Sequence, residues 1–480
     1  MIIISRWLWA IIPLLAVTAT GCAMIDPPRT ARIEDYMVHS SLEKEDKSAP
    51  GVPAQADLID ETMMKKRPLT LATCVRIALD KNPARRAAQE GVAAARESVG
   101  MAKAPYYPTV GLDAAYRRWE THAFLPEGLS GMGKPSVIGP TDDWSSGLRA
   151  SYLLFDSGRR AAQLRIALSR QGLAEEEEAS IRQDIAMAVH QAFFSLISTT
   201  EAQVVAGQNR TRAEDHLRLT KERWEAGAVP KADVIRAQVE VADAKLQLVR
   251  SDSAISLARG SLNTAMGLSV EMTVALDVEN RNMESPDKID VTGVLNQAVE
   301  CRPELKAALH RIEASRNSID VAKSAFGPTI TANGGYGYRD SEFLPEDKDW
   351  SAGVGIALPL FEGFKRGHDV SRAKHELAKA EAEIRYLVLK VREEVWGAQT
   401  KLKEAHEATQ ASEAVVRDAR ESMRMTRERY GAGAATATDL LDAQTTLARA
   451  EYVLVEARWS YFSARAALDR AMGTILDNGD

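Results

Sequence analysis

Hydrophobic and polar residues recur with a helical period along two long parts of the chain. No proline occurs between Pro140 and Pro230 or after Pro359, so nothing there removes a backbone donor and breaks a helix. The pattern predicts one helix over about 158–226 and a second over about 364–431, each ~100 Å long at ~1.5 Å per residue. Helices of this length pack along one another, as in coiled coils. In the first of them apolar residues lie three or four positions apart, at Ile181, Ile185, Ala188, Val189, Ala192 and Phe193.

Four shorter stretches alternate between apolar and polar residues instead, at 109–118, 147–154, 329–338 and 351–360. Each has about ten residues and one apolar face, which is the length and pattern of outer-membrane strands. The alternative is two soluble hairpins with one face on a core. Their place between very long helices and the export signal of the chain favour membrane strands. Since open edges are not tolerated in lipid, four strands must close with those of other copies, and both a dimer and a trimer are feasible.

The pattern occurs twice because the chain repeats itself. Residues 223–233 read RWEAGAVPKAD, and residues 429–439 read RYGAGAATATD, 429 − 223 = 206 positions later. Ala265-Met266-Gly267 returns at the same offset as Ala471-Met472-Gly473. Upstream of the strands the offset is 220, so 220 − 206 = 14 residues are inserted between Tyr116 and Trp144. This interval is rich in Gly and Pro and is predicted to form a surface loop.

Each repeat therefore consists of a helix, a β-hairpin, a long helix, a tight turn and a helix. The predicted organisation is a signal peptide (1–21), a linker (22–68), a first repeat (69–275) with its hairpin at about 106–156 and its turn at about 226–230, a connection (276–287), a second repeat (288–473) with its hairpin at about 326–361 and its turn at about 431–435, and a tail (474–480).

The N-terminus carries an export signal. Arg6 precedes an apolar run over residues 7–19 that is too short to span a bilayer core of ~30 Å. The run ends in ATGC at residues 19–22, which resembles a bacterial lipobox with Ala19 in place of the usual leucine. Cys22 would then be acylated and, after cleavage, become the lipidated N-terminus. The alternative is an ordinary signal peptide with a chance cysteine.

Composition excludes several classes of function. The net charge of −6 leaves no basic surface for nucleic acid. Cys74 and Cys301 either pair or stay free, and free buried thiols are favoured. The eight histidines are scattered without an HExxH motif, and His368 and His375 on one helix face are interpreted as a solvated pair. We expect no enzyme activity, no metal and no cofactor apart from the covalent lipid.

The lipobox, the linker and the two repeats resemble the TolC-like outer-membrane efflux family, and within it the lipoprotein branch that serves multidrug pumps. The resemblance covers about residues 69–473. It rests on the tandem R-[WY]-x-A-G…D turns, on Phe155-Asp156 and Phe361-Glu362, and on the Ala-Met-Gly endings.

The family implies a mainly α fold with a membrane β part. Three copies would share a twelve-stranded barrel in the outer membrane and a tunnel of long antiparallel helices through the periplasm. A periplasmic adaptor and an inner-membrane pump would dock at the inner end, and the chain would be a passive efflux duct for drugs or other small molecules. The alternatives are the outer component of type I protein secretion, and a lipid-anchored periplasmic coiled-coil scaffold that spans no membrane.

Each turn would be the tip of a helical hairpin at the inner mouth. Gly227 and Gly433 can take positive φ and end a helix, and Thr436 with Asp439 resembles a capping box. The resemblance makes both tips docking surfaces for the adaptor, and their residues are Gly227, Ala228, Val229, Gly433, Ala434 and Ala435.

Asp439 and Asp442 match family positions whose carboxylates ring the constricted pore. They lie three apart on one helical face, and six carboxylates in a narrow pore would attract cations. The alternative is that acids near a helix start complement the helix dipole. That alternative suffices for Asp233 and partly for Asp439, but less well for Asp442.

Tyr430 matches a family aromatic residue that ties neighbouring helices together in the closed state, with Asp233 as its partner. The arginine that completes this gate would fall at Ala435. Either another residue such as Arg236 or Arg429 replaces it, or the closed state is held differently. We expect Arg223, like Arg429, to cap carbonyls at the C-terminal ends of helices.

Overall fold

The computed structural model describes residues 68–122, 137–277, 282–286, 290–341 and 344–477. All of them belong to one compact unit, which begins at residue 58. The predicted signal peptide, Cys22 and nearly all of the predicted linker lie outside the described residues. The fold therefore does not test what was predicted for these residues.

The long helices predicted from the sequence are confirmed. α5 (Arg159–Glu225) and α9 (Lys365–Gly431) each contain 67 residues, which corresponds to ~100 Å. Shorter helices complete each half, namely α3 (Leu71–Lys81), α4 (Pro83–Lys103) and α6 (Lys231–Ala265) in the first, and α7 (Val291–Cys301), α8 (Pro303–Ser324) and α10 (Ala437–Met472) in the second.

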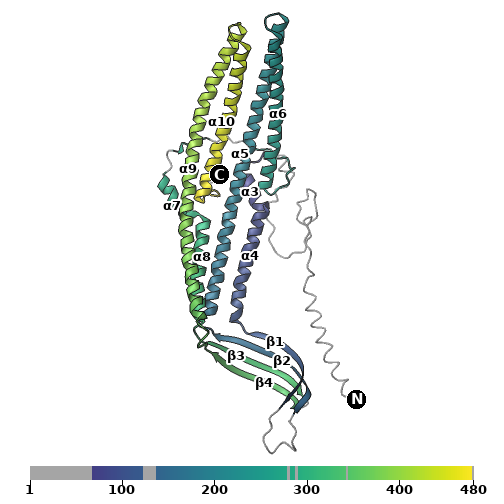
Figure 1. Cartoon of the computed structure of the whole chain (residues 1–480), viewed down its shortest axis with the longest axis vertical. Coiled ribbons are helices and arrows are strands. Elements are labelled where there is room, and N and C mark those ends of the chain that lie inside the picture. Colours follow the sequence, from purple (N-terminus) through teal and green to yellow (C-terminus); the bar gives the residue numbers. More distant parts are fainter. Residues whose placement is uncertain (1–67, 123–136, 278–281, 287–289, 342–343, 478–480) are drawn as a thin grey trace, which may run out of the picture. The chain divides into compact units, whose positions relative to one another are not determined.

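The main helices lie side by side (Figure 1). α4 and α6 pack against α5, and α8 and α10 pack between α5 and α9. The order across this layer is α4 or α6, then α5, then α8 or α10, and then α9. Within the described chain, α4, α6 and α9 are thus its outermost members. Buried alanines allow α5 to approach its neighbours closely, and they include Ala162, Ala167, Ala186, Ala192, Ala206 and Ala213.

The largest apolar core lies near the middle of the long helices, where α3 and α7 pack against them. Its aromatic rings stack across helices, with the centroids of Phe194 and Phe462 5.6 Å apart. Cys74 is buried in this core, and burial raises the pKa of its thiol to about 12. Cys74 and Cys301 are both free thiols, so they do not pair with each other.

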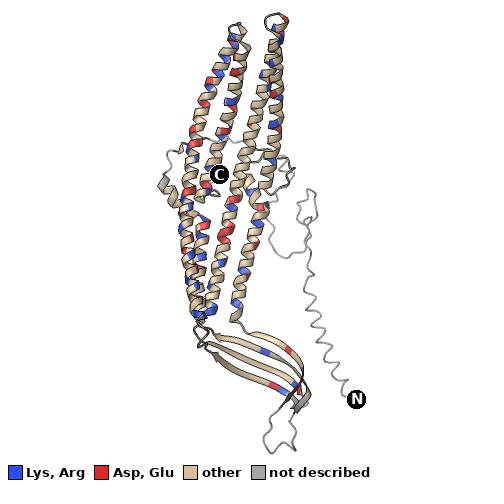
Figure 2. Cartoon of the chain, viewed as in Figure 1, with Lys and Arg blue, Asp and Glu red and all other residues tan. Residues whose placement is uncertain are grey.

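Charged side chains occur along the whole length of the helices (Figure 2). Among the helices of the described residues, none combines the length and the apolar character needed to cross a membrane.

The strands form one antiparallel sheet in the order β1 (Thr109–His122), β2 (Val137–Phe155), β3 (Thr329–Ser341) and β4 (Leu344–Ala357). All four strands run further than the pattern predicted at one end at least, and the surface loop predicted between Tyr116 and Trp144 is wrong at both of its ends. Arg117 pairs with Asp143 and Trp119 with Thr141. Pro140 falls where the register shifts, so its missing N–H breaks no regular pair.

β4 is the other correction, because it ends at Ala357 rather than at the predicted 360. Pro359 follows closely, and a proline has no N–H to give to the ladder. The alternation of apolar and polar residues continued past this point, but alternation does not register a missing donor.

Tight corners join each hairpin to its long helix. Gly158 before α5 and Phe364 before α9 have positive φ angles of 86° and 65°. Arg160 and Arg366, 206 positions apart, each donate a 2.7 Å hydrogen bond to a carbonyl of the segment that precedes the corner. The duplicated arginines thereby fix the sheet to the helices in both repeats.

Candidate functional site

One face of the sheet is apolar and uncovered. Leu112, Leu148, Tyr336 and Trp350 form a row across all four strands, paired in that order. Each of these side chains is more than half exposed in the chain, with Trp350 at 72%. An apolar face of this extent needs an apolar environment, and strands that face lipid have this pattern.

The opposite face of the sheet carries charges that pair across strands. Asp143 accepts two hydrogen bonds from Arg339, at 3.1 and 2.8 Å, and lies 3.8 Å from Arg117. Arg149 lies 3.4 Å from Asp113 on the neighbouring strand. Opposite charges in such positions stabilise strand pairing. A polar face behind an apolar one is the arrangement of a strand between lipid and a wet lumen.

The sheet does not close on itself within the described residues. β1 pairs only with β2, and β4 only with β3. In lipid each unpaired backbone group costs several kcal/mol. The two open edges therefore require strands from other copies of the chain.

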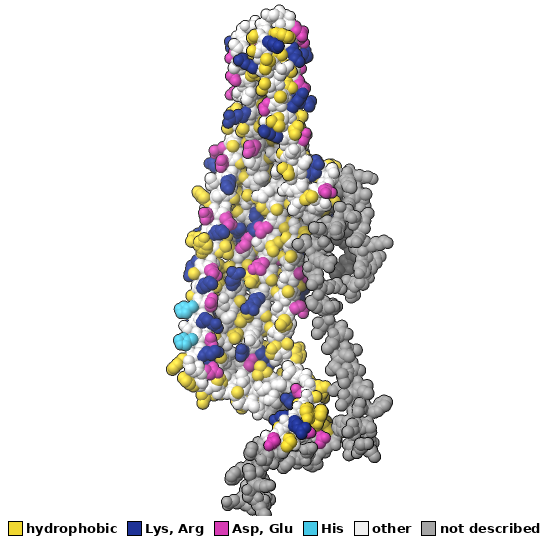
Figure 3. Space-filling model, turned by 45° about the vertical axis from the view of Figure 1, so that its right-hand side comes forward, with side chains coloured by type: hydrophobic (Ala, Val, Ile, Leu, Met, Phe, Trp, Pro, Cys, Tyr) yellow, Lys and Arg dark blue, Asp and Glu magenta, His cyan; other side chains and the backbone are white. Residues whose placement is uncertain are grey.

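The outermost helices of the layer also carry uncovered apolar side chains at helical spacing, and Figure 3 shows such side chains among the charged ones. They are 46–76% exposed. On α6 they are Ile235, Val239, Leu246, Val249 and Leu257, and on α9 they are Tyr386, Leu389, Trp396, Val415 and Met425. Helices and strands thus present open edges together, as expected of one segment of a closed ring.

The two tips have the same backbone. Gly227 and Gly433 have φ angles of 74° and 75°, which confirms the positive φ expected for both. In each, the N–H of the residue after the glycine donates 2.8 Å to a carbonyl in the last turn of the helix, from Ala228 to Arg223 and from Ala434 to Arg429. These bonds satisfy carbonyls that a helix end leaves free.

The small residues of the tips are open to a partner. Gly227, Ala228, Gly433 and Ala434 are exposed. The last residue of each tip motif, at positions 229 and 435, is partly exposed. Their role in docking an adaptor is a prediction that the fold permits.

Asp439 forms the expected capping box with Thr436. Its Oδ2 accepts from the Thr436 N–H at 2.8 Å, and the Thr436 hydroxyl accepts from the Asp439 N–H at 3.2 Å. The hydrogen bond from the Thr436 N–H, together with one from the Thr436 hydroxyl to the same oxygen at 2.8 Å, holds the pKa of Asp439 below its usual range. Asp442 is exposed and makes no hydrogen bond or ion pair among the described residues. Capping therefore accounts for Asp439, whereas the role of Asp442 in the pore stays a prediction.

Arg223 caps carbonyls, as expected, but those of another helix. It donates to the carbonyls of Tyr430 (2.8 Å) and Gly431 (2.6 Å) at the end of α9. Its guanidinium carbon lies 4.6 Å from the centroid of the Tyr430 ring. Arg429, at the equivalent position of the second repeat, donates to Ala434 in its own turn at 3.3 Å.

Tyr430 and Asp233 form no hydrogen bond with each other in the described chain. The buried Tyr430 hydroxyl has no hydrogen-bond partner among the described residues, and its ring packs against His216 with centroids 5.7 Å apart. Asp233 lies 3.6 Å from Arg236 on its own helix. Within the chain, Arg236 and Arg429 both bind within their own hairpin, and the replacement of the arginine absent at Ala435 stays a prediction.

Sequence reasoning missed His216. It is buried two turns before Arg223 on α5, and burial lowers its pKa while Asp233 opposes that shift. Its spacing of seven residues from Arg223 was the available signal, because such residues share a helix face.

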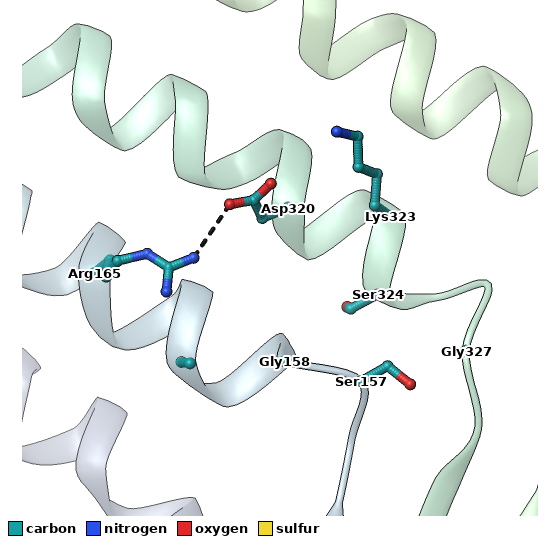
Figure 4. A pocket seen from close by; sticks show the side chains of 8 residues that line it. Ser157, Gly158, Arg165, Asp320, Lys323, Ser324 and Gly327 are labelled. Carbon is teal, nitrogen blue, oxygen red and sulfur yellow. Dashed lines mark hydrogen bonds and ion pairs between the residues drawn. The ribbon is translucent and has the colours of Figure 1, made fainter.

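A groove lies between the start of α5 and the end of α8 (Figure 4). Arg165 and Asp320 form an ion pair across it at 3.2 Å, and Ser157 donates to the Pro328 carbonyl at 2.8 Å. These contacts join the two helices and the turn before β3, so the role of the groove is structural. The described residues contain no cluster of three or more metal-ligating side chains.

Comparison with known proteins places this geometry in a family. The family described as outer membrane efflux protein matches residues 74–268 and 294–474. The chain is 27% identical to protein CyaE of Bordetella pertussis over 86% of each chain. It is 25% identical to the pyoverdine export outer membrane protein OpmQ of Pseudomonas aeruginosa over 81% of each.

A solved structure shows the same fold. The CmeC outer membrane channel of Campylobacter jejuni matches with a TM-score of 0.73 at 19% identity, over 84% of this chain and 86% of that one. The predicted fold class, long antiparallel helices with four strands per chain, is confirmed.

Proposed function

The chain belongs to the outer membrane efflux protein family, and we propose that it is the outer membrane channel of a tripartite efflux system. The family is one of channels rather than of enzymes. The observation that carries the proposal is the sheet, with its bare apolar face, its charged opposite face and its two open edges. Three copies would supply twelve strands and close both the sheet and the layer of helices.

The proposed duct is passive and works with two protein partners. An inner-membrane pump supplies the energy, and a periplasmic adaptor binds the exposed small residues of the two tips. OpmQ is named for the export of pyoverdine, and we propose small molecules as the cargo of this chain as well. Acylation of Cys22 would anchor the chain in the outer membrane and complement the barrel.

A periplasmic scaffold without a membrane span is the competing function. It would leave the row from Leu112 to Trp350 in water. A soluble protein rarely exposes so extended an apolar surface, and the charges on the opposite face would then have no lumen to line.

The test is single-channel conductance of the purified, membrane-extracted protein in a planar bilayer. Asp442→Asn removes a carboxylate without touching the capping box, whereas Asp439→Asn also weakens the cap. We expect cation-selective conductance in the wild type and a loss of selectivity in Asp442→Asn. Asp418→Asn, which removes an exposed carboxylate of α9 remote from the tips, is the matched control.

Each outcome has a distinct meaning. Conductance with unchanged selectivity in Asp442→Asn would support the channel but would show that its constriction lies elsewhere. Absence of conductance from a well-folded oligomer, under any applied voltage and in every variant, would contradict the channel and favour the scaffold.

A further inference from the structure

The internal repeat predicts which faces of the chain meet when copies join. The contacting helices follow one another across the layer in the order α4, α5, α8 and α9, so that a short helix alternates with a long one. α8 repeats α4 at an offset of 220 positions, and α9 repeats α5 at an offset of 206. In a closed ring, α4 of the next copy follows α9. The contact between α5 and α8 inside the chain is therefore the template for a contact between α9 and that α4.

The corner before α9 holds a strained and uncovered aromatic side chain. Phe364 has a φ of 65°, and its equivalent Gly158, 364 − 158 = 206 positions earlier, has a φ of 86°. At positive φ a side chain is strained, whereas glycine is not. The Phe364 ring is 76% exposed and lies 5.4 Å from the ring of Phe361, which is itself 72% exposed. Strain of this kind persists where other contacts hold it, and the described residues leave this ring uncovered.

Inside the chain, the corner before α5 is closed by small and polar groups. Ser157 donates a hydrogen bond to the Pro328 carbonyl at 2.8 Å. The serine side chain leaves no room at Gly327, where a Cβ would collide with it. Across the same groove, Arg165 and Asp320 form an ion pair at 3.2 Å (Figure 4). Hydrogen bonds and charge thus join α5 to α8 at this corner.

Between two copies, the equivalent positions exchange a small side chain for a large one. Tyr107 is equivalent to Gly327, since 327 − 107 = 220, and Gly363 is equivalent to Ser157, since 363 − 157 = 206. Gly363 therefore lacks the side chain that would otherwise collide with the tyrosine. Its φ of 59° is close to the 56° of Ser157, so the backbone of the corner is the same. Tyr107 is 70% exposed in the chain, so it is available to a partner.

The helix faces beside the corner are complementary in the same way. Ser371 and Gly100 stand at the positions of Arg165 and Asp320, since 371 − 165 = 206 and 320 − 100 = 220. The ion pair therefore has no counterpart between copies. Ser371 and Gly100 are both small and exposed, and they leave room for a ring. Phe364, which stands where the first repeat has a glycine, can supply that ring.

We propose that Phe364 of one copy packs against Tyr107 of the next copy, where the sheet meets the helices. The inference rests on the proposed channel function, because it concerns how the copies of that channel join. Two aromatic rings attract each other in offset or edge-to-face arrangements, and the tyrosine hydroxyl can stay in water. α5 and α8 separate α4 from α9 within one chain, so the two rings meet only between copies. Each copy offers one ring on each side, and contacts of a single kind close the ring of copies.

The first test is cross-linking of the full-length, membrane-extracted oligomer with a short bis-maleimide. Tyr107→Cys and Phe364→Cys, combined in one chain, should yield covalent oligomers on denaturing gels. The two single variants report any reaction through the native cysteines. Glu90→Cys with Phe364→Cys is the matched control and should not cross-link, because Glu90 is an exposed residue of α4 remote from the corner.

The second test is native mass spectrometry of the oligomer over a range of protein concentrations. Phe364→Ala and Tyr107→Ala should each raise the dissociation constant of the oligomer about tenfold or more, because several aromatic contacts are lost at once. The double variant should add little to either single variant, since both remove the same contact. Phe364→Gly should weaken assembly although it removes the backbone strain, which separates loss of the contact from damage to the corner.

The outcomes distinguish the contact from the channel. An oligomer of wild-type mass without the cross-link, or single-variant effects that multiply in the double variant, would overturn the contact and leave the channel standing. If the cysteine pair loses the oligomer, Gly100→Cys with Ser371→Cys decides, because it tests the same faces with both rings in place. Wild-type protein that is extracted as single chains and gives no conductance would contradict the channel function itself.

Discussion

The first and second helical tips share one backbone and differ in what their side chains do. Both glycines have φ near 75°, and both turns close with the same pair of hydrogen bonds. Yet Arg223 crosses to the other hairpin while Arg429 stays in its own turn. Asp439 caps its helix, whereas the equivalent Asp233 pairs with Arg236. The two repeats thus share the backbone of the turn, while equivalent side chains make different contacts because their surroundings differ.

The sheet repeats this lesson with a pair of glycines. Gly147 and Gly353 are equivalent residues, 206 positions apart. A Cβ on Gly147 would lie 3.0 Å from the Cα of Gly337, on the seam between β2 and β3. A Cβ on Gly353, on the outer strand β4, would meet nothing within 4 Å. Glycine is therefore required at position 147, whereas position 353 has room for a side chain within the chain.

The largest effect is expected at that seam. Gly147→Ala should destabilise the folded protein by about 1–3 kcal/mol, because only backbone atoms of β3 surround the added methyl group and they must move. Gly353→Ala should change stability by less than about 0.5 kcal/mol. Urea unfolding of the extracted protein measures both. Equal losses in the two variants would break the comparison, and would indicate that β1 of another copy approaches β4 equally closely.

A smaller effect is expected where the two tips are alike. Gly433→Ala should cost about 1–2 kcal/mol, because a side chain at positive φ is strained, and Gly227→Ala should cost the same. Gly431→Ala is the matched control. Gly431 lies in the last turn of α9 without positive φ, so alanine there should raise the free energy of unfolding by about 0.5–1 kcal/mol. Amide hydrogen exchange at the tips measures these differences, and co-purification with the adaptor reports docking. Unequal exchange in the two tip variants would show that the tips differ in backbone stability after all.

Much of the fold could be predicted because it depends on local patterns. Proline-free stretches with helical periodicity predicted α5 and α9. Gly227 and Gly433 with their neighbours predicted the turns at the ends of these helices. The capping box of Thr436 and Asp439 was equally local. Strand ends were harder, since the pairing of Arg117 with Asp143 depends on a partner strand that sequence alternation does not reveal.

The contacts between helices could not be predicted, because they depend on which faces meet. The tip motifs around Arg223 and Arg429 do not reveal which arginine crosses to the other hairpin. The difference arises because α5 ends beside the last turn of α9. His216 was missed for the same reason, since a buried histidine on a helix of 67 residues is recognised only when its neighbours Tyr430 and Asp233 are placed.

The smallest effect is expected from His216, on the helix that precedes the first tip. Its ring packs against Tyr430 of α9, and the Asp233 carboxylate of α6 acts on its charge. Its pKa is lowered by burial in the folded chain and ordinary in the unfolded one. Its stabilising contribution is therefore complete above about pH 6.5 and is lost as the pH falls through the folded value.

The measurement is hydrogen exchange at the end of α5 between pH 7.5 and pH 5, with intrinsic rates corrected for pH. Protection should fall on acidification in the wild type, and the fall should be smaller in His216→Asn. His375→Asn, which changes an exposed histidine of α9, should behave as the wild type does. The effect should be modest, because the Asp233 carboxylate opposes the shift that burial causes. A fall of the same size in His216→Asn would assign the pH dependence to other groups, and the second tip would then be expected to share it.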